Sequence, residues 1–410
     1  MTSVEDQDER VGTRPSPREL LDRAIALRPL LVEQSAETEA RRYYSEEIHR
    51  AFDDAGFYRS LIPHRYGGLE LDMTNWLRLI AELAHGDIQA AWGFTLAAGH
   101  ALQVASFWEE RAQDEMFGNG DFRAASVAAP TGTAVKVDGG WRVTGAWPYS
   151  SGAPYSTYYM GQTLIRDEGV PPRMMLFVAD RSQWEMLDDW GDLLGLRGSG
   201  SHTVKLEDAF VPDGWGLPDT QLVEVDVSGG TPGSRLHGNP MYAGRCFSVF
   251  QLELTALMIG AAKGALDEYQ AIVTTKRTQR PPSVIRAEDP DYQRWFGVSI
   301  GKLATAEAAM LNGADQWTEL ARRNVEEDAG FSREDDMVLN FIAREGMRMA
   351  WDTMQEHLVR TAGSSALRDG ERLQRIYRDM TMGHGHFASL FGDVVARRIG
   401  QYRLGVEVVG

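Results

Sequence analysis

Hydrophobic positions change their spacing twice along this chain, and each spacing predicts a different kind of structure. From about residue 17 to 116, apolar residues recur every three or four positions, which is typical of amphipathic helices. From about 124 to 211, short runs of alternating apolar and polar residues favour β-strands. Helical spacing then returns in four stretches, at about 243–276, 291–325, 333–362 and 371–401. The pattern predicts an α+β protein, mainly α, in the order helices, strands, helices.

Local signals place several boundaries along this pattern. Ser16, Pro17 and Glu19 have the residue types of an N-cap, a first helical position and the third position of a capping box, so a helix is expected to begin there. Two alternating runs at 135–137 and 141–143 flank an Asp-Gly-Gly sequence, which predicts a β-hairpin.

Five segments are expected from the spacing and these signals together. They are a disordered leader at 1–15, an N-terminal helical domain at 16–122, a central β domain at 123–212, a Gly/Pro-rich connecting loop at 213–240 and a C-terminal helical bundle at 241–410.

Composition narrows the range of partners and compartments. The chain of 410 residues carries 42 Lys and Arg against 59 Asp and Glu, a net charge of −17, which argues against nucleic acid. Its single cysteine, Cys246, can form neither an internal disulfide nor a cysteine-based metal site. The first fifteen residues lack an apolar core for a secretory signal, and the apolar run at 247–266 contains Gln251, Glu253 and Lys263. We expect a cytoplasmic protein that binds no membrane.

Several common enzyme motifs are missing from the sequence. A strand followed by G-x-G-x-x-G, a phosphate-binding G-x-x-x-x-G-K-[ST] and a G-x-S-x-G are all absent, which disfavours nicotinamide-binding, NTPase and α/β-hydrolase folds. The pair His384 and His386 has no evident third ligand, so no metal site is expected.

Three short passages together resemble the acyl-CoA dehydrogenase superfold. They are LIPHRYGGL at 61–69, GLRGSGS at 195–201 and RIYRD at 375–379. The resemblance implies an N-terminal helical domain, a small central β-barrel or sandwich, and a C-terminal four-helix bundle. Most dehydrogenases of this fold use a Glu eight residues after the Asp of the Arg-Asp pair, where this chain has Phe387. A phenyl ring accepts no proton, so ordinary desaturation lacks its base. A dehydrogenase with a displaced base stays an alternative.

A second branch of the superfold matches better at several positions. The sequence GAWPYSSG at 145–152, with His100, Ser126 and His386, resembles the oxygenase component of two-component flavin monooxygenases such as phenol and hydroxylated-steroid hydroxylases. The resemblance implies exchangeable reduced FMN or FAD, supplied by a separate NAD(P)H flavin reductase, and a homotetramer. It implies that O2 forms a flavin C4a-hydroperoxide, which hydroxylates an aromatic or polycyclic small molecule. Oxygenation of nitrogen, as in an amino sugar, or of sulfur stays open, as does a non-catalytic scaffold of this fold.

The resemblance also assigns roles at the end of the predicted β domain. Ser151 is expected to accept a hydrogen bond from flavin N5, with Ser150 as its neighbour. Trp147 and Tyr149 are expected to keep the site dry. The simpler alternative is that both serines bond the backbone at the end of a strand.

Two histidines are the candidates for moving protons. An imidazole titrates near neutral pH, so one of His100 and His386 is expected to bind or activate the substrate hydroxyl, and the other to protonate or stabilise the peroxide. Ser126 is expected to bond the same hydroxyl. For His100 the alternative is a helix histidine satisfied by one buried hydrogen bond. Relatives often have an Asp four residues after the last histidine, where this chain has Leu390.

Three further residues are candidates for cofactor contacts. Arg277 resembles a bundle residue that reaches a flavin phosphate, often across a subunit interface, and guanidinium groups suit phosphates. Arg197 is a candidate to face cofactor or substrate. Gly363 stands where the dehydrogenases have a double glycine near their flavin. An exposed arginine at a charged helix end is the alternative for Arg277.

Overall fold

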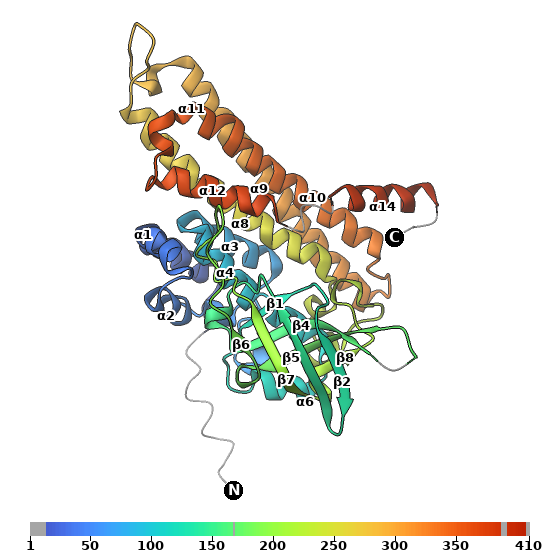
Figure 1. Ribbon diagram of the computed structural model, residues 1–410. Coiled ribbons are helices and arrows are strands. Elements are labelled where there is room, and N and C mark those ends of the chain that lie inside the picture. Colours follow the sequence, from blue (N-terminus) through green and yellow to red (C-terminus); the bar gives the residue numbers. More distant parts are fainter. Residues whose placement is uncertain (1–13, 167–168, 387–391, 407–410) are drawn as a thin grey trace.

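The computed structural model describes residues 14–166, 169–386 and 392–406 (Figure 1). Nearly all of the expected leader at 1–15 falls outside these ranges, as do Phe387 and Leu390. The roles expected of those positions therefore stay predictions.

The N-terminal part is helical, as its spacing predicts. Ser16 Oγ accepts from the Glu19 amide at 3.3 Å and the Glu19 carboxylate accepts from the Ser16 amide at 2.7 Å, so the expected capping box is present. The helical region expected from 74 to 116 is confirmed, but it is divided into four short helices. The helices are α1 Pro17–Arg41, α2 Glu46–Asp54, α3 Met73–Gly86, α4 Ile88–Ala98, α5 Ala101–Phe107 and α6 Glu110–Phe117.

An eight-stranded sheet follows, in the order β6-β7-β3-β2-β4-β5-β8, with β1 parallel to β4. The expected hairpin is confirmed, since β2 and β3 pair antiparallel and Val137 faces Gly140. The strands are β1 Ala124–Val127, β2 Thr133–Val137, β3 Gly140–Trp147, β4 Tyr158–Ile165, β5 Arg173–Asp180, β6 Glu185–Met186, β7 Val204–Pro212 and β8 Gly216–Pro218.

The segment at 213–240 is more ordered than its composition suggests. β8 pairs with β5 and extends the sheet. A short helix, α7 Pro232–His237, begins at a capping box formed by Thr231 and Ser234. Glycine and proline in this segment make turns between these elements.

Long helices form the C-terminal part. The first three expected stretches are confirmed as α8 Cys246–Thr275, α9 Pro290–Glu326 and α10 Arg333–Thr353, the last continuing through a π-helical turn at Met354–Val359 into α11 Arg360–Ala362. The fourth is interrupted: α12 Arg372–His384 ends before His386, and α14 Gly392–Leu404 follows. Short 3-10 turns stand at Phe57–Arg59, His64–Tyr66, Ala153–Tyr155, Arg181–Gln183, Asp213–Trp215, Leu222–Glu224, Pro240–Ala243, Arg286–Glu288 and Ser364–Leu367.

α8 is the central helix of the fold. It packs against α3 on one side and against α9 and α10 on the other. Among the described residues it is the one helix long and apolar enough to cross a membrane, yet 83% of its apolar stretch is buried inside the protein, as expected of a core helix. Figure 1 shows the sheet at one end of the molecule, while α11 and the α8–α9 connection lie at the other.

Candidate functional site

The turn after β3 carries Ser151 into contact with α4. Gly152 has a φ of 77°, and a Cβ there would lie 2.3 Å from the Gly93 carbonyl oxygen, so only glycine permits this close approach. As a result Ser151 is buried against Trp92, whose Nε1 donates to Ser151 Oγ at 3.1 Å.

Ser151 begins a chain of buried hydroxyl groups. Ser151 Oγ lies 2.7 Å from Ser201 Oγ, and Ser201 Oγ lies 2.7 Å from Ser199 Oγ. Ser199 Oγ then donates to the Leu196 carbonyl at 2.8 Å. We call Trp92, Ser151, Ser201 and Ser199 the serine chain. The GLRGSGS sequence was a marker of the fold, but the partnership of its serines with Ser151 has no signal in the sequence.

His386 also contacts Trp92. The two rings meet edge to face, with centroids 5.5 Å apart. Burial lowers the pKa of His386 to about 4, so its imidazole is neutral at neutral pH. The structure therefore brings the predicted residues Ser151 and His386 together around an indole that sequence reasoning placed only in a helical core.

His100 and Ser126 are two further predicted site residues. His100 is the N-cap of α5, in the turn after α4, and its Nδ1 lies 2.8 Å from the Ala124 carbonyl oxygen. Because a carbonyl only accepts, the proton is on Nδ1 and Nε2 carries the lone pair. Burial lowers the pKa of His100 to about 4, which keeps the ring neutral. Ser126, 9% exposed, is two residues along β1 and therefore on the same strand face as Ala124.

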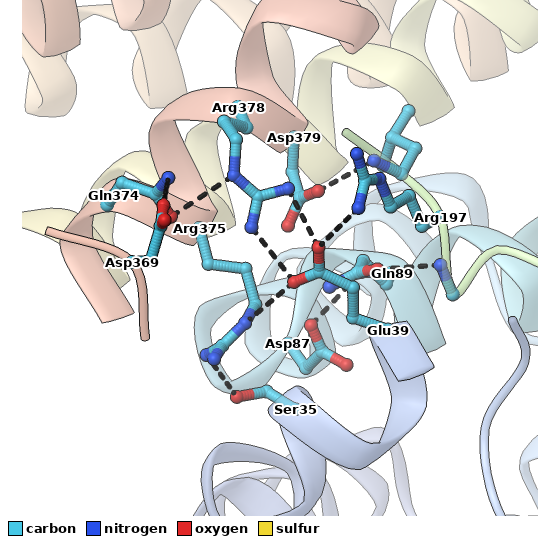
Figure 2. A network of polar contacts seen from close by, with 12 residues as sticks. Ser35, Glu39, Asp87, Gln89, Arg197, Asp369, Gln374, Arg375, Arg378 and Asp379 are labelled. Atoms are coloured by element: carbon cyan, nitrogen blue, oxygen red, sulfur yellow. Dashed lines mark hydrogen bonds and ion pairs between the residues drawn. The ribbon is translucent and has the colours of Figure 1, made fainter. Parts of the chain in front are cut away.

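A polar network holds the 195–201 loop against the helices (Figure 2). Asp379 Oδ1 accepts from the Leu196 amide at 2.6 Å, and Gln89 Oε1 accepts from the Gly198 amide at 2.6 Å. These two bonds tie the loop to α12, which ends two residues before His386, and to α4, which contains Trp92.

Charged groups complete this network. Glu39 on α1 receives Arg378 at 2.8 Å and Arg375 at 3.0 Å, both from α12. We call Glu39, Arg375, Arg378 and Asp379 the charged clamp. It joins the first helix, the β-domain loop and the last part of the bundle.

Arg197 belongs to the edge of the charged clamp. Its Nε donates to the Leu193 carbonyl, and its Nη1 lies 3.7 Å from the Glu39 carboxylate. The Arg197 side chain is partly exposed and bonds groups of the protein, and its expected contact with cofactor or substrate stays a prediction.

Two buried carboxyl groups are neighbours here, that of Asp87 and that of Asp379 in the charged clamp. Burial raises the pKa of Asp87, the N-cap of α4, to about 7. Burial, and then the neighbouring charge of Asp87, raise the pKa of Asp379 well above its usual value. A cavity of about 10 Å³, large enough for about one water, is lined by both.

Two of the expected flavin neighbours serve the β domain instead. Ser150 Oγ donates to the Trp147 carbonyl at 2.8 Å. This bond to the backbone at the end of a strand is the simpler alternative given above for the two serines. Trp147 is fully buried against Tyr159 and Phe177, and its Nε1 donates to the Gln162 carbonyl at 2.9 Å. Their positions explain the folding of the turn and correct the expectation that Trp147 shields the site.

Tyr149 does not close the site either. It has a φ of 64°, and its side chain is 61% exposed and meets Trp190 edge to face. Its ring therefore stands at the surface, where it excludes little water.

Arg277 and Gly363 meet at the far end of the bundle. Arg286, which sequence reasoning missed, donates from Nη1 to the Ala362 carbonyl at 2.7 Å and from Nε to the Arg277 carbonyl at 3.4 Å. The Arg277 guanidinium is exposed and bonds Ser283. The structure brings these two predicted residues together, but at the end of the molecule opposite the sheet (Figure 1).

Glu253 on α8 is a buried carboxyl that sequence reasoning used only as a break in an apolar run. Trp76 Nε1 donates to its Oε1 at 2.8 Å, and burial raises its pKa to about 8. A Cβ at Gly99 would lie 2.7 Å from the same oxygen, so Glu253 lies against the turn that carries His100.

The two histidines considered for a metal site have separate partners. His384 stacks on Trp351 with centroids 5.1 Å apart, whereas His386 contacts Trp92. Within the described ranges, no three His, Cys, Asp or Glu side chains form a group that could hold a metal ion.

Comparison with known proteins matches both ends of the chain to one family. The acyl-CoA dehydrogenase N-terminal domain matches residues 15–115, and the acyl-CoA dehydrogenase C-terminal domain matches residues 252–390. The chain is 28% identical to a pigment production hydroxylase of Rhodococcus sp., over 95% of this chain and 97% of the relative. It is also 28% identical to the oxygenase subunit HsaA of a flavin-dependent monooxygenase of Rhodococcus jostii, over 90% and 94%.

A solved structure confirms the fold over almost the whole length. XiaF from Streptomyces sp., in complex with FADH2 and glycerol, superposes with a TM-score of 0.87 over 96% of this chain and 97% of that one, at 21% identity. The expected three-part architecture is thereby confirmed.

Proposed function

Because the chain belongs to the acyl-CoA dehydrogenase family, among its flavin-dependent monooxygenase oxygenase components, we propose that it uses reduced flavin and O2 to hydroxylate an aromatic or polycyclic small molecule. The observation that carries the proposal is that Trp92 contacts both Ser151 and His386. The bound flavin supplies the electrons that activate oxygen. The chain supplies hydrogen bonds, proton acceptors and a buried site.

Ser151 fits a reduced flavin by its hydrogen-bonding capacity. A hydroxyl has one donor and two acceptor positions. One acceptor position of Ser151 receives the Trp92 N–H, and one stays open for an N–H of the reduced isoalloxazine ring. Burial of Ser151 strengthens such a bond, since water competes for it less.

His100 is the residue we propose as base for a phenolic hydroxyl. Its Nδ1 proton is held by the Ala124 carbonyl, so Nε2 is the nitrogen that can accept the substrate proton. Ser126 is proposed to bond the same hydroxyl. His386, neutral and beside Trp92, is proposed to bond the reacting oxygen atoms.

The central experiment measures coupling of oxygen to product. Protein, reduced FAD or FMN and a panel of phenols are mixed with ¹⁸O2, and labelled product and hydrogen peroxide are both quantified. We expect label in the product, and in Ser151→Ala about tenfold more peroxide per product, the loss of about one hydrogen bond. Unlabelled product with every phenol, or no product, would refute hydroxylation.

His100 separates hydroxylation of phenols from oxygenation of nitrogen or sulfur. A nucleophilic amine or thioether needs no deprotonation, so His100→Gln should leave its oxygenation intact. Conversion of phenols should fall about 100-fold, the ordinary contribution of a general base. Equal loss for both substrate types would remove His100 from the base role.

Glu253 is a structural candidate for the displaced base of the dehydrogenase alternative. Its pKa of about 8 means that the carboxyl is mainly protonated at neutral pH, and Trp76 already occupies one oxygen. Anaerobic addition of an acyl-CoA to the oxidised flavin complex tests this reading. Bleaching of the flavin that disappears in Glu253→Gln would favour the dehydrogenase, and we expect none.

Arg277 and Arg286 are proposed to receive a flavin phosphate from a neighbouring copy in a homotetramer. An exposed Arg277 guanidinium near the Gly363 turn suits a phosphate. Because α11 and the α8–α9 connection lie at the end of the molecule opposite the sheet, we propose that this phosphate belongs to a flavin of a second copy. Arg277→Ala should weaken FAD binding about tenfold. A monomeric protein by sedimentation would exclude this arrangement, and a dimeric protein would exclude only the homotetramer.

We further propose that a separate NAD(P)H flavin reductase in the cytoplasm delivers the reduced flavin. The described residues of this chain carry no nucleotide-binding βαβ unit that would let it reduce its own flavin. Addition of NADH to protein and flavin should give no product until a reductase is added.

A further inference from the structure

We propose that Ser199 and Ser201 act as positioning residues that force Ser151 to accept rather than donate at its open position, and that this makes the site favour reduced over oxidised flavin. The inference rests on the proposed function and deepens it. It follows from the direction in which each hydroxyl proton of the serine chain must point.

The direction is set at the end of the serine chain farthest from Trp92. Ser199 Oγ lies 2.8 Å from the Leu196 carbonyl oxygen, which can only accept. Were the Ser199 proton turned elsewhere, two lone-pair oxygens would face each other at that distance inside the protein. Ser199 therefore donates to Leu196.

The remaining protons follow one by one. A serine has a single proton, so Ser199, having donated to Leu196, must accept from Ser201 at 2.7 Å. Ser201 has then used its proton and must accept from Ser151 at 2.7 Å. Ser151 has in turn used its own, and Trp92 occupies one of its two acceptor positions.

The charged clamp holds the Leu196 carbonyl, where this series of hydrogen bonds begins, in place. Asp379 accepts from the Leu196 amide at 2.6 Å, and Trp190 Nε1 donates to the Leu196 carbonyl at 3.1 Å. The peptide groups on both sides of Leu196 are therefore fixed, and its carbonyl cannot rotate away from Ser199.

The consequence concerns the redox state of the ligand. Reduced flavin has an N–H at N5 and donates to the open position of Ser151. Oxidised flavin has a lone pair at N5, which would meet the Ser151 lone pair. One bond made in one state and a repulsive contact in the other correspond to about a tenfold difference in affinity, since a buried neutral hydrogen bond contributes about one factor of ten.

Ser199→Ala tests the direction without touching Ser151. Without the Ser199 hydroxyl, the Ser201 proton turns to Ser151, whose own proton is then free to donate to oxidised flavin. The dissociation constants of oxidised flavin and of anaerobically reduced flavin are measured by fluorescence and calorimetry. We expect the oxidised-to-reduced ratio of these constants to fall about tenfold in Ser199→Ala and also in Ser201→Ala.

Two control variants separate direction from packing. Ser199→Thr keeps the hydroxyl and should keep the wild-type ratio. Ser156→Ala removes another buried serine hydroxyl of the same turn, one that donates to the Gly152 carbonyl at 3.0 Å, and should also keep the ratio. If Ser199→Ala does not fold, Ser199→Cys replaces it, and the weaker thiol donor should lower the ratio part of the way.

The outcomes distinguish this inference from the proposed function. An unchanged ratio in natively folded Ser199→Ala and Ser201→Ala overturns the inference alone. Equal weakening of both redox forms also overturns it, because that is what a merely structural role predicts. Wild-type protein that binds neither redox form overturns the proposed function.

Discussion

Two polar networks act on the same loop at 195–201, and they differ in how they are made. The charged clamp uses carboxylates and guanidinium groups from both ends of the chain. The serine chain uses only neutral groups, each with one proton to give. Ion pairs tolerate some variation in angle, so they are suited to holding segments together. Hydroxyl groups transmit a direction, so they are suited to deciding which side of a bond donates.

Removal of the centre of the charged clamp should have the largest effect on stability. Glu39→Ala leaves Arg375 and Arg378 buried without their carboxylate, which should cost about 3 kcal/mol in the free energy of unfolding. Urea unfolding measures this. Glu37→Ala, on the same helix, removes an exposed ion pair with Arg41 and should change stability by less than about 0.5 kcal/mol. Similar losses in both variants would show that the clamp is no stronger than a surface pair.

The stability of the protein should also depend on pH through Asp87, the neighbour of the charged clamp. Its pKa of about 7 is above the usual value of about 3.9, so the folded state holds the proton more tightly and stability falls as pH rises from about 4 to 7. Asp87→Asn keeps an acceptor oxygen for the N-cap and lacks this dependence. Its free energy of unfolding relative to wild type should rise by about 1–2 kcal/mol over that range.

Urea midpoints measured at several pH values decide this prediction. Asp379 lies beside Asp87 and is expected to titrate together with it, so the change should be spread over more than one pH unit. A constant difference between Asp87→Asn and wild type from pH 4 to 7 would show that Asp87 ionises normally in the folded protein.

The serine chain should matter less for stability and not depend on pH. Ser201→Ala removes a buried hydroxyl and leaves its neighbours with one bond fewer, a loss of about 1 kcal/mol. No group of the serine chain ionises between pH 4 and 8, so the loss of stability should be equal at pH 4 and at pH 8. A pH-dependent loss would mean that the two networks are coupled.

Arg197 should have the smallest effect of all. Its guanidinium is partly exposed and 3.7 Å from Glu39, so Arg197→Ala should lower the free energy of unfolding by less than about 0.5 kcal/mol. Flavin affinity should be unchanged in the same variant. A clear loss of flavin binding would restore the role that the sequence suggested.

Local signals account for what was predictable in the fold. The capping box at Ser16 and the hairpin at 135–143 depend on neighbouring residues, and both are present. The interruption after His384 was missed because the helical spacing continues through it. Strand β8 was missed because three residues among glycines and prolines give no periodic pattern.

The site was predictable in its residues but not in its partnerships. Ser151, His386, His100 and Ser126 were identified through motifs. The structure brings Ser151 and His386 to Trp92, and the expected roles of all four residues stay predictions. Trp147 was named because it belongs to the same motif as Ser151, yet its side chain lies in the β core, where its Nε1 bonds the Gln162 carbonyl. Partners that come from 50 or more residues away, such as Ser201, leave no trace in a local pattern.

The bond between Leu196 and Asp379 has a consequence for how the protein is made. The two residues are 183 positions apart, so a growing chain on the ribosome completes the serine loop long before the carboxylate that fixes it exists. Ser151, Ser199 and Ser201 are all synthesised by then, but their order cannot be set. The hydrogen-bond order that we propose for the serine chain therefore depends on α12, which is synthesised after all three serines.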